Sequence, residues 1–338
     1  MNKIGIIGNA GNGSQIGGQI TKTVELVHYF DKKNFDYKFV NVRGISPVKL
    51  LLEINYLFKA CDRVIIILAS TGYFKILPLV VYLAKKYSTQ IYEIVIGGIR
   101  QEYVIKYPWR FNLEKKIYKI YVESTYMEKK YHEMGFEQAT YLPNYKSFEI
   151  VENIVENRED ELHLCTFSRI DEYKGIDTAI DVVSKINKGE TAKVILDIYG
   201  PIKESYKAQI TKKIKEAELY GVTYKGVVST EQAQEVLKAY DLLLFPTHWI
   251  TEGFPGTFID ALSAGLPIIS SKRPNFTDIV DKGYNGYLVD EYDIDTFSAI
   301  ISDLYHDRDK LIQMKKNAVR SSAKYRTDNV LVKLIEES

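Results

Sequence analysis

The stretch "FPTHWITEGFPGTFIDALSAGLPIIS", residues 245–270, decides the fold because it holds a strand, a loop, a helix and a second strand in succession. The first strand ends at Pro246, and a helix is predicted over 257–264, with a proline near its first turn and a glycine after its last. Apolar residues at 267–271 predict the next strand. This order is typical of a parallel sheet covered by helices.

The same alternation extends through the rest of the chain and is broken once. The polar, acid-rich stretch "YLPNYKSFEIVENIVENREDE", from residue 141, interrupts it and predicts an interdomain linker. The expected strands are 3–8, 37–42, 63–69, 91–97 and 119–124 before the linker, and 162–168, 192–200, 222–226, 241–246 and 267–271 after it. The chain is therefore predicted to be α/β, with two doubly wound, Rossmann-like domains.

Domain boundaries follow from the position of the linker. We expect a first domain over 1–150, a second over 151–320 and a C-terminal helix over 321–338 that packs back toward the first. Ligands of doubly wound sheets bind at the carboxyl ends of the strands. Two such domains facing each other would form a cleft suited to two substrates.

Composition limits the classes of protein that this chain can belong to. With 46% hydrophobic and 26% charged residues, it has the composition of a soluble globular protein. No stretch reaches the roughly 20 apolar residues of a membrane span, and no apolar segment after Lys3 predicts secretion. Cys61 and Cys165 lack metal-ligand spacing, so buried free thiols are expected.

Charge is distributed unevenly along the chain. Residues 1–150 hold 21 Lys and Arg against 13 Asp and Glu, whereas the remainder is acidic overall. A basic half favours contact with an anionic partner, such as a phospholipid surface or a lipid phosphate. Solvated surface charge without a partner is the alternative.

The N-terminal stretch "GIIGNAGNGSQIGGQITK", residues 4–21, raises the hypothesis of a dinucleotide site. Gly11 and Gly13 fit the G-x-G-x-x-G pattern, but Ile16 stands where the third glycine belongs. The second strand also ends without the acid that would bind ribose, so only an NADP variant using Arg43 would survive. The pattern favours a glycine loop that approaches a different ligand.

The helix that starts near Gly256 predicts an anion site. Free N–H groups at Gly256 and Thr257, together with the helix dipole, favour a phosphate at this N-terminus. Asp260 lies one turn into the helix, with its side chain leaning toward the N-terminus. A carboxylate in that position can accept both hydroxyls of a ribose while the amides hold the attached diphosphate.

Glu252 and Asp260, with seven residues between them, resemble the E-x₇-E element of retaining glycosyltransferases of the GT-B fold, especially family 4, the glycosyl transferases group 1. The similarity covers about residues 140–290 in order. Its other segments are "YLPNYKSF" with Asn144, "FSRIDEYKGIDTAI" (167–180), "LDIYG" ending at Gly200, and "VTYKGVVSTEQAQEVLKAYDLLLFPT". The first half of the chain matches only in pattern.

The resemblance implies a retaining, metal-independent glycosyltransferase that moves a sugar from a nucleotide sugar, with a UDP-sugar favoured. The first domain would be on the acceptor side, and the second would bind the donor. The acceptor would be a glycan or lipid-linked molecule in surface polysaccharide or glycolipid synthesis. Nucleotide-sugar epimerase or hydrolase activity on the same fold, and a non-catalytic sugar-nucleotide-binding subunit, remain alternatives.

The resemblance also assigns site residues. Glu252, Arg169 and Lys174 are the catalytic candidates, because a guanidinium fork and an ammonium can stabilise a departing diphosphate without a metal or other cofactor. The acids of "DEYDID" (290–295) look like a solvated loop rather than a metal-binding D-x-D. The donor-binding candidates are Gly17, Gly18, Gly200, Phe254, Pro255, Gly256, Thr257 and Asp260.

Three departures from the family pattern indicate further candidates. The loop between Pro246 and Glu252 is two residues longer than usual, so His248 and Trp249 are acceptor or sugar candidates unless they form a packed or exposed loop. Asp260 replaces the usual glutamate and is one methylene shorter. The histidine that relatives place after the fourth strand is missing, which leaves Arg100 or backbone groups to contact the donor or acceptor.

Residues 103–121, "YVIKYPWRFNLEKKIYKIY", interleave basic and aromatic side chains. Such a segment can lie at a lipid interface, and an ordinary exposed helix is the alternative. We therefore expect a cytoplasmic protein that associates peripherally with the inner face of the cell membrane and does not bind nucleic acid.

Overall fold

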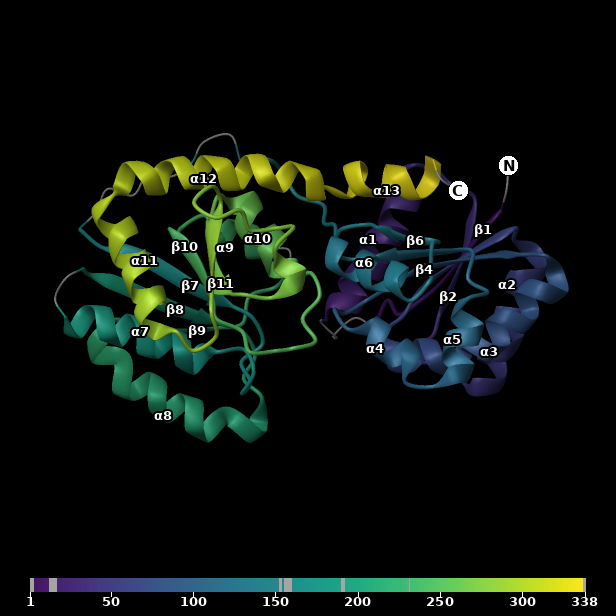
Figure 1. Cartoon of the computed structure of the whole chain (residues 1–338), viewed down its shortest axis with the longest axis horizontal. Helices are drawn as coiled ribbons and strands as arrows, with labels where there is room; N and C mark the ends of the chain where they lie inside the picture. Colours follow the sequence, from purple (N-terminus) through teal and green to yellow (C-terminus); the bar gives the residue numbers. More distant parts are fainter. Residues whose placement is uncertain are drawn as a thin grey trace. The chain divides into compact units, whose positions relative to one another are not determined.

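A computed structural model of the chain describes residues 3–11, 17–151, 154, 160–189, 192–230 and 232–336. The chain forms two compact units, each built on its own sheet (Figure 1). Unit 1 comprises Met1–Ser147, Thr251–Gly256 and Tyr325–Ser338, and unit 2 comprises Phe148–Ile250 and Thr257–Lys324. Unit 1 thus contains the short segment that carries Glu252, although the sequence placed this segment with the second domain.

Unit 1 has a six-stranded parallel sheet in the order β2-β1-β3-β4-β5-β6. Its strands are β1 (Ile4–Gly8), β2 (Tyr37–Asn41), β3 (Arg63–Ile67), β4 (Gln90–Ile94), β5 (Lys119–Val122) and β6 (Ala139–Tyr141). Its helices are α1 (Gly18–Lys32), α2 (Pro47–Ala60), α3 (Ser70–Tyr87), α4 (Arg100–Ile105), α5 (Pro108–Glu114), α6 (Thr125–Glu133) and α13 (Thr327–Glu336). The five strands predicted before the linker are confirmed, and β6 was missed.

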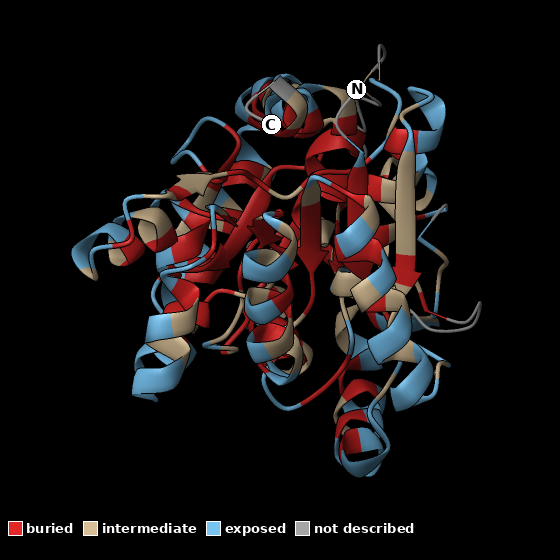
Figure 2. Cartoon of the chain, turned by 90° about the vertical axis from the view of Figure 1, so that its right-hand side faces the viewer, coloured by how far each residue is buried: buried red, intermediate tan, exposed pale blue. Residues whose placement is uncertain are grey.

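Both faces of this sheet are covered by helices. Apolar residues of α2, α3 and α6 pack on one face. On the other face, Leu26 and Phe30 of α1 meet Leu331 and Leu334 of α13 over the strands. Figure 2 shows the buried residues along the strands and inner helix faces, with the exposed residues on the outer helix faces. This burial on both sides is why the strands are nearly continuous apolar runs.

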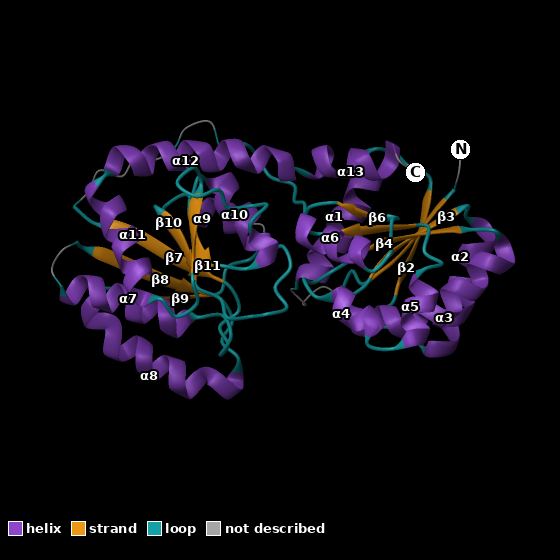
Figure 3. Ribbon diagram, in the orientation of Figure 1, coloured by secondary structure: helices purple, strands orange, loops and turns teal. Residues whose placement is uncertain are grey.

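Unit 2 has a second parallel sheet, in the order β12-β11-β10-β7-β8-β9. Figure 3 shows strands of this sheet with helices around them. Its strands are β7 (Leu162–Phe167), β8 (Val194–Tyr199), β9 (Val222–Gly226), β10 (Leu242–Phe245), β11 (Ile268–Ser271) and β12 (Gly286–Val289). Its helices are α7 (Ile176–Lys188), α8 (Lys207–Ala217), α9 (Ala233–Leu237), α10 (Gly256–Ala264, which starts in unit 1), α11 (Ile294–His306) and α12 (Arg308–Ser322). Short 3₁₀ turns lie at Glu204–Tyr206, Glu218–Tyr220, Pro274–Phe276 and Ala323–Tyr325.

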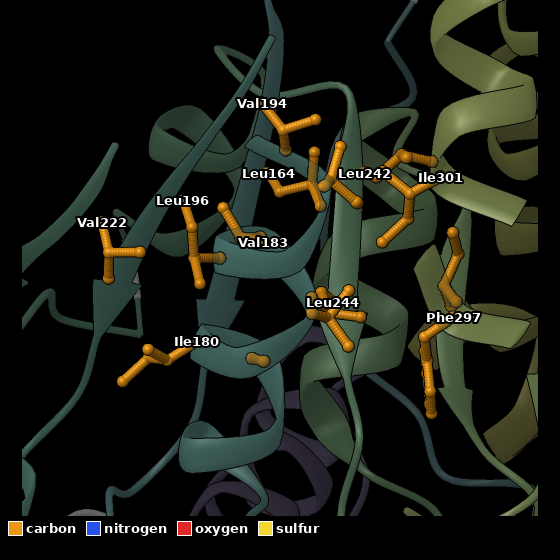
Figure 4. Close-up of a cluster of buried hydrophobic side chains, with 14 of the residues drawn as sticks. Leu164, Ile180, Val183, Val194, Leu196, Val222, Leu242, Leu244, Phe297 and Ile301 are labelled. Carbon is orange, nitrogen blue, oxygen red and sulfur yellow. The ribbon is translucent and has the colours of Figure 1, made fainter. Parts of the chain in front are cut away.

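The core of unit 2 joins its central strands to α7 and α11. Figure 4 shows Leu164 and Leu242 of neighbouring strands close to Val183 of α7 and Ile301 of α11, and all four are fully buried. The five strands predicted after the linker are confirmed, as are the two doubly wound α/β sheets. Cys61 and Cys165 are buried and unbridged, as expected. Within the described ranges, no helix is both long and apolar enough to cross a membrane.

Unit 1 also buries a cluster of charged groups. Arg100 pairs with Glu93, and both side chains are fully buried. Glu114 accepts a hydrogen bond from Tyr73 Oη at 2.9 Å. Burial, with the nearby Glu93 charge adding to it, raises the pKa of the Glu114 carboxyl well above its usual range. One guanidinium thus lies near two carboxyls, and burial favours the neutral form of the Glu114 carboxyl.

We predict that Glu114→Gln stabilises unit 1 increasingly as pH rises from about 5 to about 8. The folded chain holds the Glu114 proton to a higher pH than the unfolded chain does, so wild-type stability falls as pH rises through this window. Glutamine stays neutral and removes that loss. Melting temperatures across the pH range measure the difference, with Glu133→Gln on the exposed face of α6 as control. A pH-independent offset would contradict the prediction.

Candidate functional site

The start of α10 is attached to the carboxyl edge of the sheet of unit 2. Thr257 Oγ1 donates to the carbonyl of Phe167, the last residue of β7, at 3.0 Å. The ring of Phe258 packs on the ring of Phe245, the last residue of β10, and the two ring centroids are 5.1 Å apart. Asp260 is 9% exposed, one turn into the helix. The N-terminus of α10 therefore lies where β7 and β10 end, and the first amides of a helix have no partners within the helix and lie at the positive end of its dipole.

The loop after β7 carries both predicted cations. Arg169 Nε donates to Asp171 at 3.0 Å, and the arginine side chain is 58% exposed. Asp171 is buried and also accepts from the Tyr173 amide at 3.1 Å, so its carboxylate is held in place and orients the Arg169 guanidinium. Lys174 directly precedes the glycine that caps α7, and its Nζ lies 5.8 Å from the Phe245 ring. Both cations thus lie at the edge where α10 starts.

Trp249 belongs to this group, whereas His248 is packed inside unit 2. The Trp249 ring lies 5.9 Å from the Arg169 guanidinium, 5.6 Å from Lys174 Nζ and 5.1 Å from the Tyr173 ring. His248 is buried, shares a hydrogen bond with Thr178 at 3.1 Å, and has its pKa lowered mainly by burial. The acceptor or sugar role of Trp249 stays a prediction. For His248, the packed-loop alternative matches its surroundings.

Two glycines of unit 2 allow the loops to approach each other. Gly200 has φ 137°, and an added Cβ would lie 1.8 Å from the carbonyl oxygen of Ser168. Gly175 has φ 68°, and its Cβ would lie 1.8 Å from the carbonyl oxygen of Pro246. Only glycine fits both the conformation and the space. Gly200 was among the predicted site residues and Gly175 was not, although "KG" just before a helical pattern is a usable signal.

The glycine candidates of unit 1 lie at the start of α1. Gly18 is the first residue of the helix and Gly17 caps it in an extended conformation. A Cβ at either would meet no atom within 4 Å among the described residues. Residues 12–16, which include Gly13 and Ile16 of the dinucleotide test, lie outside the described ranges. Contact of Gly17 and Gly18 with a donor stays a prediction.

Arg100 has surroundings that the sequence did not indicate. Besides its pair with Glu93, its Nη2 donates to the carbonyl of Leu68 at 2.6 Å, and the residue is 1% exposed. The rings of Tyr73 and Phe74 lie against the guanidinium. Its charge is used inside unit 1, so contact with an acceptor or sugar would require this internal pair to open.

Glu252 lies in a segment that unit 1 holds from several sides. Glu252 itself is partly exposed, while Phe254 and Pro255 are buried. The Phe254 ring packs on Tyr325 at 4.9 Å, and its carbonyl accepts from Asn144 Nδ2 at 3.0 Å. The Phe254 amide donates to Glu123 Oε2 at 3.4 Å. Sequence reasoning missed Glu123, although an acid directly after a buried strand is a recognisable signal.

A model of the family described as glycosyl transferases group 1 matches residues 147–321. The chain belongs to the glycosyl transferases group 1 family. The resemblance seen in the sequence is thereby confirmed.

Curated relatives of this group 1 member match over part of its length. The amylovoran biosynthesis glycosyltransferase AmsK of Erwinia amylovora is 25% identical over 146 residues, which is 41% of this chain and 35% of that protein. The poly(glycerol-phosphate) alpha-glucosyltransferase of Bacillus subtilis is 26% identical over 165 residues, 48% of this chain and 24% of that protein. The chain thus spans about a third or less of these two relatives.

Solved structures match along the whole chain. Anabaena Alr3699/HepE, solved in complex with UDP, has a TM-score of 0.77 at 14% identity, with 100% of this chain and 99% of that chain covered. The lipopolysaccharide outer core galactosyltransferase WaaB in its apo form has a TM-score of 0.71 at 17% identity, with 99% and 100% covered. At these identities the likeness shows the fold, and the GT-B fold predicted from the sequence is confirmed.

Acidic clusters give no indication of a metal centre in this family member. Across the described part of the chain, no three His, Cys, Asp or Glu side chains are placed to hold a metal ion. In "DEYDID", Asp293 caps α11 by accepting from the Thr296 amide at 3.0 Å. Activity without a metal or cofactor stays a prediction.

We predict that Gly175→Ala lowers the free energy of unfolding by more than about 2 kcal/mol, against about 1 kcal/mol for Gly226→Ala. Both glycines have positive φ in unit 2, but a Cβ at Gly226 would meet no described atom within 4 Å, whereas one at Gly175 would collide with the Pro246 carbonyl. Denaturant unfolding of the two variants measures the difference. Equal costs would show that the close approach of α7 to the end of β10 is dispensable.

Proposed function

We propose that this group 1 family member is a retaining glycosyltransferase that transfers a sugar from a nucleotide sugar, with a UDP-sugar favoured. The acceptor would be a glycan or lipid-linked molecule in surface polysaccharide or glycolipid synthesis. One observation carries the proposal: Arg169, Lys174 and the start of α10 share one sheet edge of unit 2. Two cations and a helix N-terminus at one edge suit a diphosphate.

The chemistry requires stabilisation of the leaving nucleoside diphosphate. Arg169 would bind phosphate oxygens as a fork and Lys174 as a point charge, with the α10 amides completing the site. Asp171 holds Arg169 before substrate arrives, so little reorganisation accompanies bond cleavage. Asp260 would accept the ribose hydroxyls, and Glu252 would contact the transferred sugar.

The proton of the acceptor would pass to the donor phosphate itself, on the face from which the diphosphate departs. This route supplies retention of configuration and requires no metal or cofactor in the proposed reaction. UDP in the HepE complex supports the choice of nucleotide, and the names of the curated relatives support a polysaccharide or poly(glycerol-phosphate) acceptor.

We predict that UDP raises the melting temperature of the wild-type chain, and that Lys174→Ala and Glu252→Ala each reduce kcat of sugar transfer by about 10²–10³-fold without unfolding the protein. Transfer from UDP-sugars to lipid or glycan extracts provides the measurement. Lys185→Ala, which removes an exposed lysine of α7 paired with Asp295, is the matched control. A wild-type kcat of sugar transfer in both site variants would contradict the proposal.

An acceptor-free reaction separates the alternatives. A nucleotide-sugar epimerase or hydrolase would convert the donor with no acceptor present, whereas a transferase would leave most of it intact. A non-catalytic sugar-nucleotide-binding subunit would show the UDP-dependent thermal shift but no turnover with any extract.

We further propose that α4 and α5 contact an anionic membrane. Tyr103, Ile105, Tyr107 and Trp109 are exposed by 38% to 57%, and Lys106, Arg110, Lys115 and Lys116 accompany them. Exposed aromatic and aliphatic side chains among basic ones are the combination that anionic interfaces bind.

Vesicle co-sedimentation tests this contact. We predict that the wild type binds vesicles with anionic lipid more strongly than neutral ones, and that Ile105→Ser/Trp109→Ser lowers binding about tenfold because apolar area is lost. Leu219→Ser removes an equally apolar, 73% exposed side chain from unit 2 and serves as control. If the double variant bound anionic vesicles as strongly as the wild type, the proposed membrane contact of α4 and α5 would be wrong.

A further inference from the structure

Unit 1 holds a buried ion pair that the proposed chemistry does not use. Lys22 Nζ, one turn into α1, donates to Glu123 Oε1 at 2.8 Å, and the two side chains are 2% and 6% exposed. Glu123 directly follows β5 and precedes the residue that caps α6. Neither residue was among the site residues predicted from the sequence.

The second oxygen of Glu123 binds two backbone segments at once. Glu123 Oε2 accepts from the amide of Gly97, beyond the end of β4, at 3.2 Å and from the amide of Phe254 at 3.4 Å. Gly253 lies directly on this carboxylate, because a Cβ there would come within 2.3 Å of Oε2. The Glu123 carboxylate therefore fixes how closely the backbone of Gly253 and Phe254 approaches the end of β5.

The residues on either side of Glu252 are held in the same way. The Gly98 amide donates to the Thr251 carbonyl at 3.1 Å, and Asn144 Nδ2 donates to the Phe254 carbonyl at 3.0 Å. Glu252 thus lies between two positions that the end of β4, Glu123 and Asn144 fix. The backbone position of Glu252 is therefore limited by the fixed positions of Thr251 and Phe254.

Burial makes this arrangement dependent on both charges. A carboxylate with almost no exposure must be neutralised and hydrogen-bonded, and Lys22 with the two amides satisfies Glu123. Removing one member leaves the other charge buried and unpaired, which is more costly than replacing both with neutral groups. Gly253 is packed closely against Glu123 Oε2 and the backbone of Gly97 and Gly98. The loop therefore has little room to move with the carboxylate if the carboxylate shifts.

We propose that the Lys22–Glu123 pair is a positioning device for the segment Thr251–Gly256 and thereby for Glu252. The pair acts on the rate of transfer through the loop, and it leaves nucleotide affinity to Arg169 and Lys174 of unit 2. The inference rests on the proposed role of Glu252 in sugar transfer.

Two double variants isolate the effect of the Glu123 oxygen that accepts hydrogen bonds from the Gly97 and Phe254 amides. Lys22→Met/Glu123→Gln removes both charges but keeps an oxygen that can accept from Gly97 and Phe254. Lys22→Met/Glu123→Leu removes the same charges, has similar volume and lacks that oxygen. Lys130→Met/Glu133→Gln deletes an exposed pair of α6 as the matched control.

We expect the Gln variant to stay within about tenfold of wild-type kcat and the Leu variant to lose about 10²-fold, because small displacements of a reacting group have effects of that size. The Kd for UDP should change by less than about 2-fold in both, since a lost interaction confined to the transition state leaves ground-state binding intact. A purely structural role would move the melting temperature without separating kcat of the two variants. Equal kcat in all three variants, or parallel losses in kcat and UDP affinity, would overturn the proposal.

Amide hydrogen exchange gives a readout that needs no activity. The Phe254 and Gly97 amides should exchange faster in the Leu variant than in the Gln variant, with the Met127 amide, which is bonded to Ser124 in α6, as internal reference. Unchanged protection would refute the positioning role even if the protein turned over no nucleotide sugar. Faster exchange in the Leu variant, together with no transferase activity of the wild type, would instead contradict the proposed function and leave the positioning contact intact.

Discussion

A single backbone carbonyl, that of Tyr173, joins the two loops on which the proposed donor site of unit 2 depends. It accepts from the His248 amide at 2.7 Å and from Thr247 Oγ1 at 3.3 Å, so the loop after β10 is bonded to the loop after β7. This bond places Trp249 beside the two cations. The close approach also requires Gly175, because the Pro246 carbonyl occupies the space of a side chain.

Parallel strands explain why these groups meet at all. The carboxyl ends of β7 and β10 lie at the same edge because the strands pair directly, and α10 leaves from that edge. The proposed diphosphate site therefore combines a helix N-terminus with cations from a neighbouring loop, all built on backbone that the sheet fixes. Charges held on such backbone need little reorganisation during the reaction, which is the condition for fixed charges to stabilise a leaving group.

The apolar runs of the sequence were sufficient to predict ten strands, because strands buried on both faces leave little ambiguity. β6 and β12 were missed because they have three and four residues and carry polar or half-buried positions. Among the site residues, Arg169 and Lys174 were recognisable from a local motif. Glu123 has a local signal, since it directly follows a buried strand, but no local motif shows its contact with Phe254, which joins residues 131 positions apart. Arg100 was assigned to a ligand because the sequence does not show that Glu93, on the preceding strand, faces it.

The most direct test of the proposed donor site is a crystal structure of this chain grown with UDP. We expect the diphosphate to lie within hydrogen-bond reach of the Arg169 guanidinium and Lys174 Nζ, beside the first turn of α10, with the ribose next to Asp260. A nucleotide bound elsewhere, with Arg169 still paired only to Asp171, would contradict it.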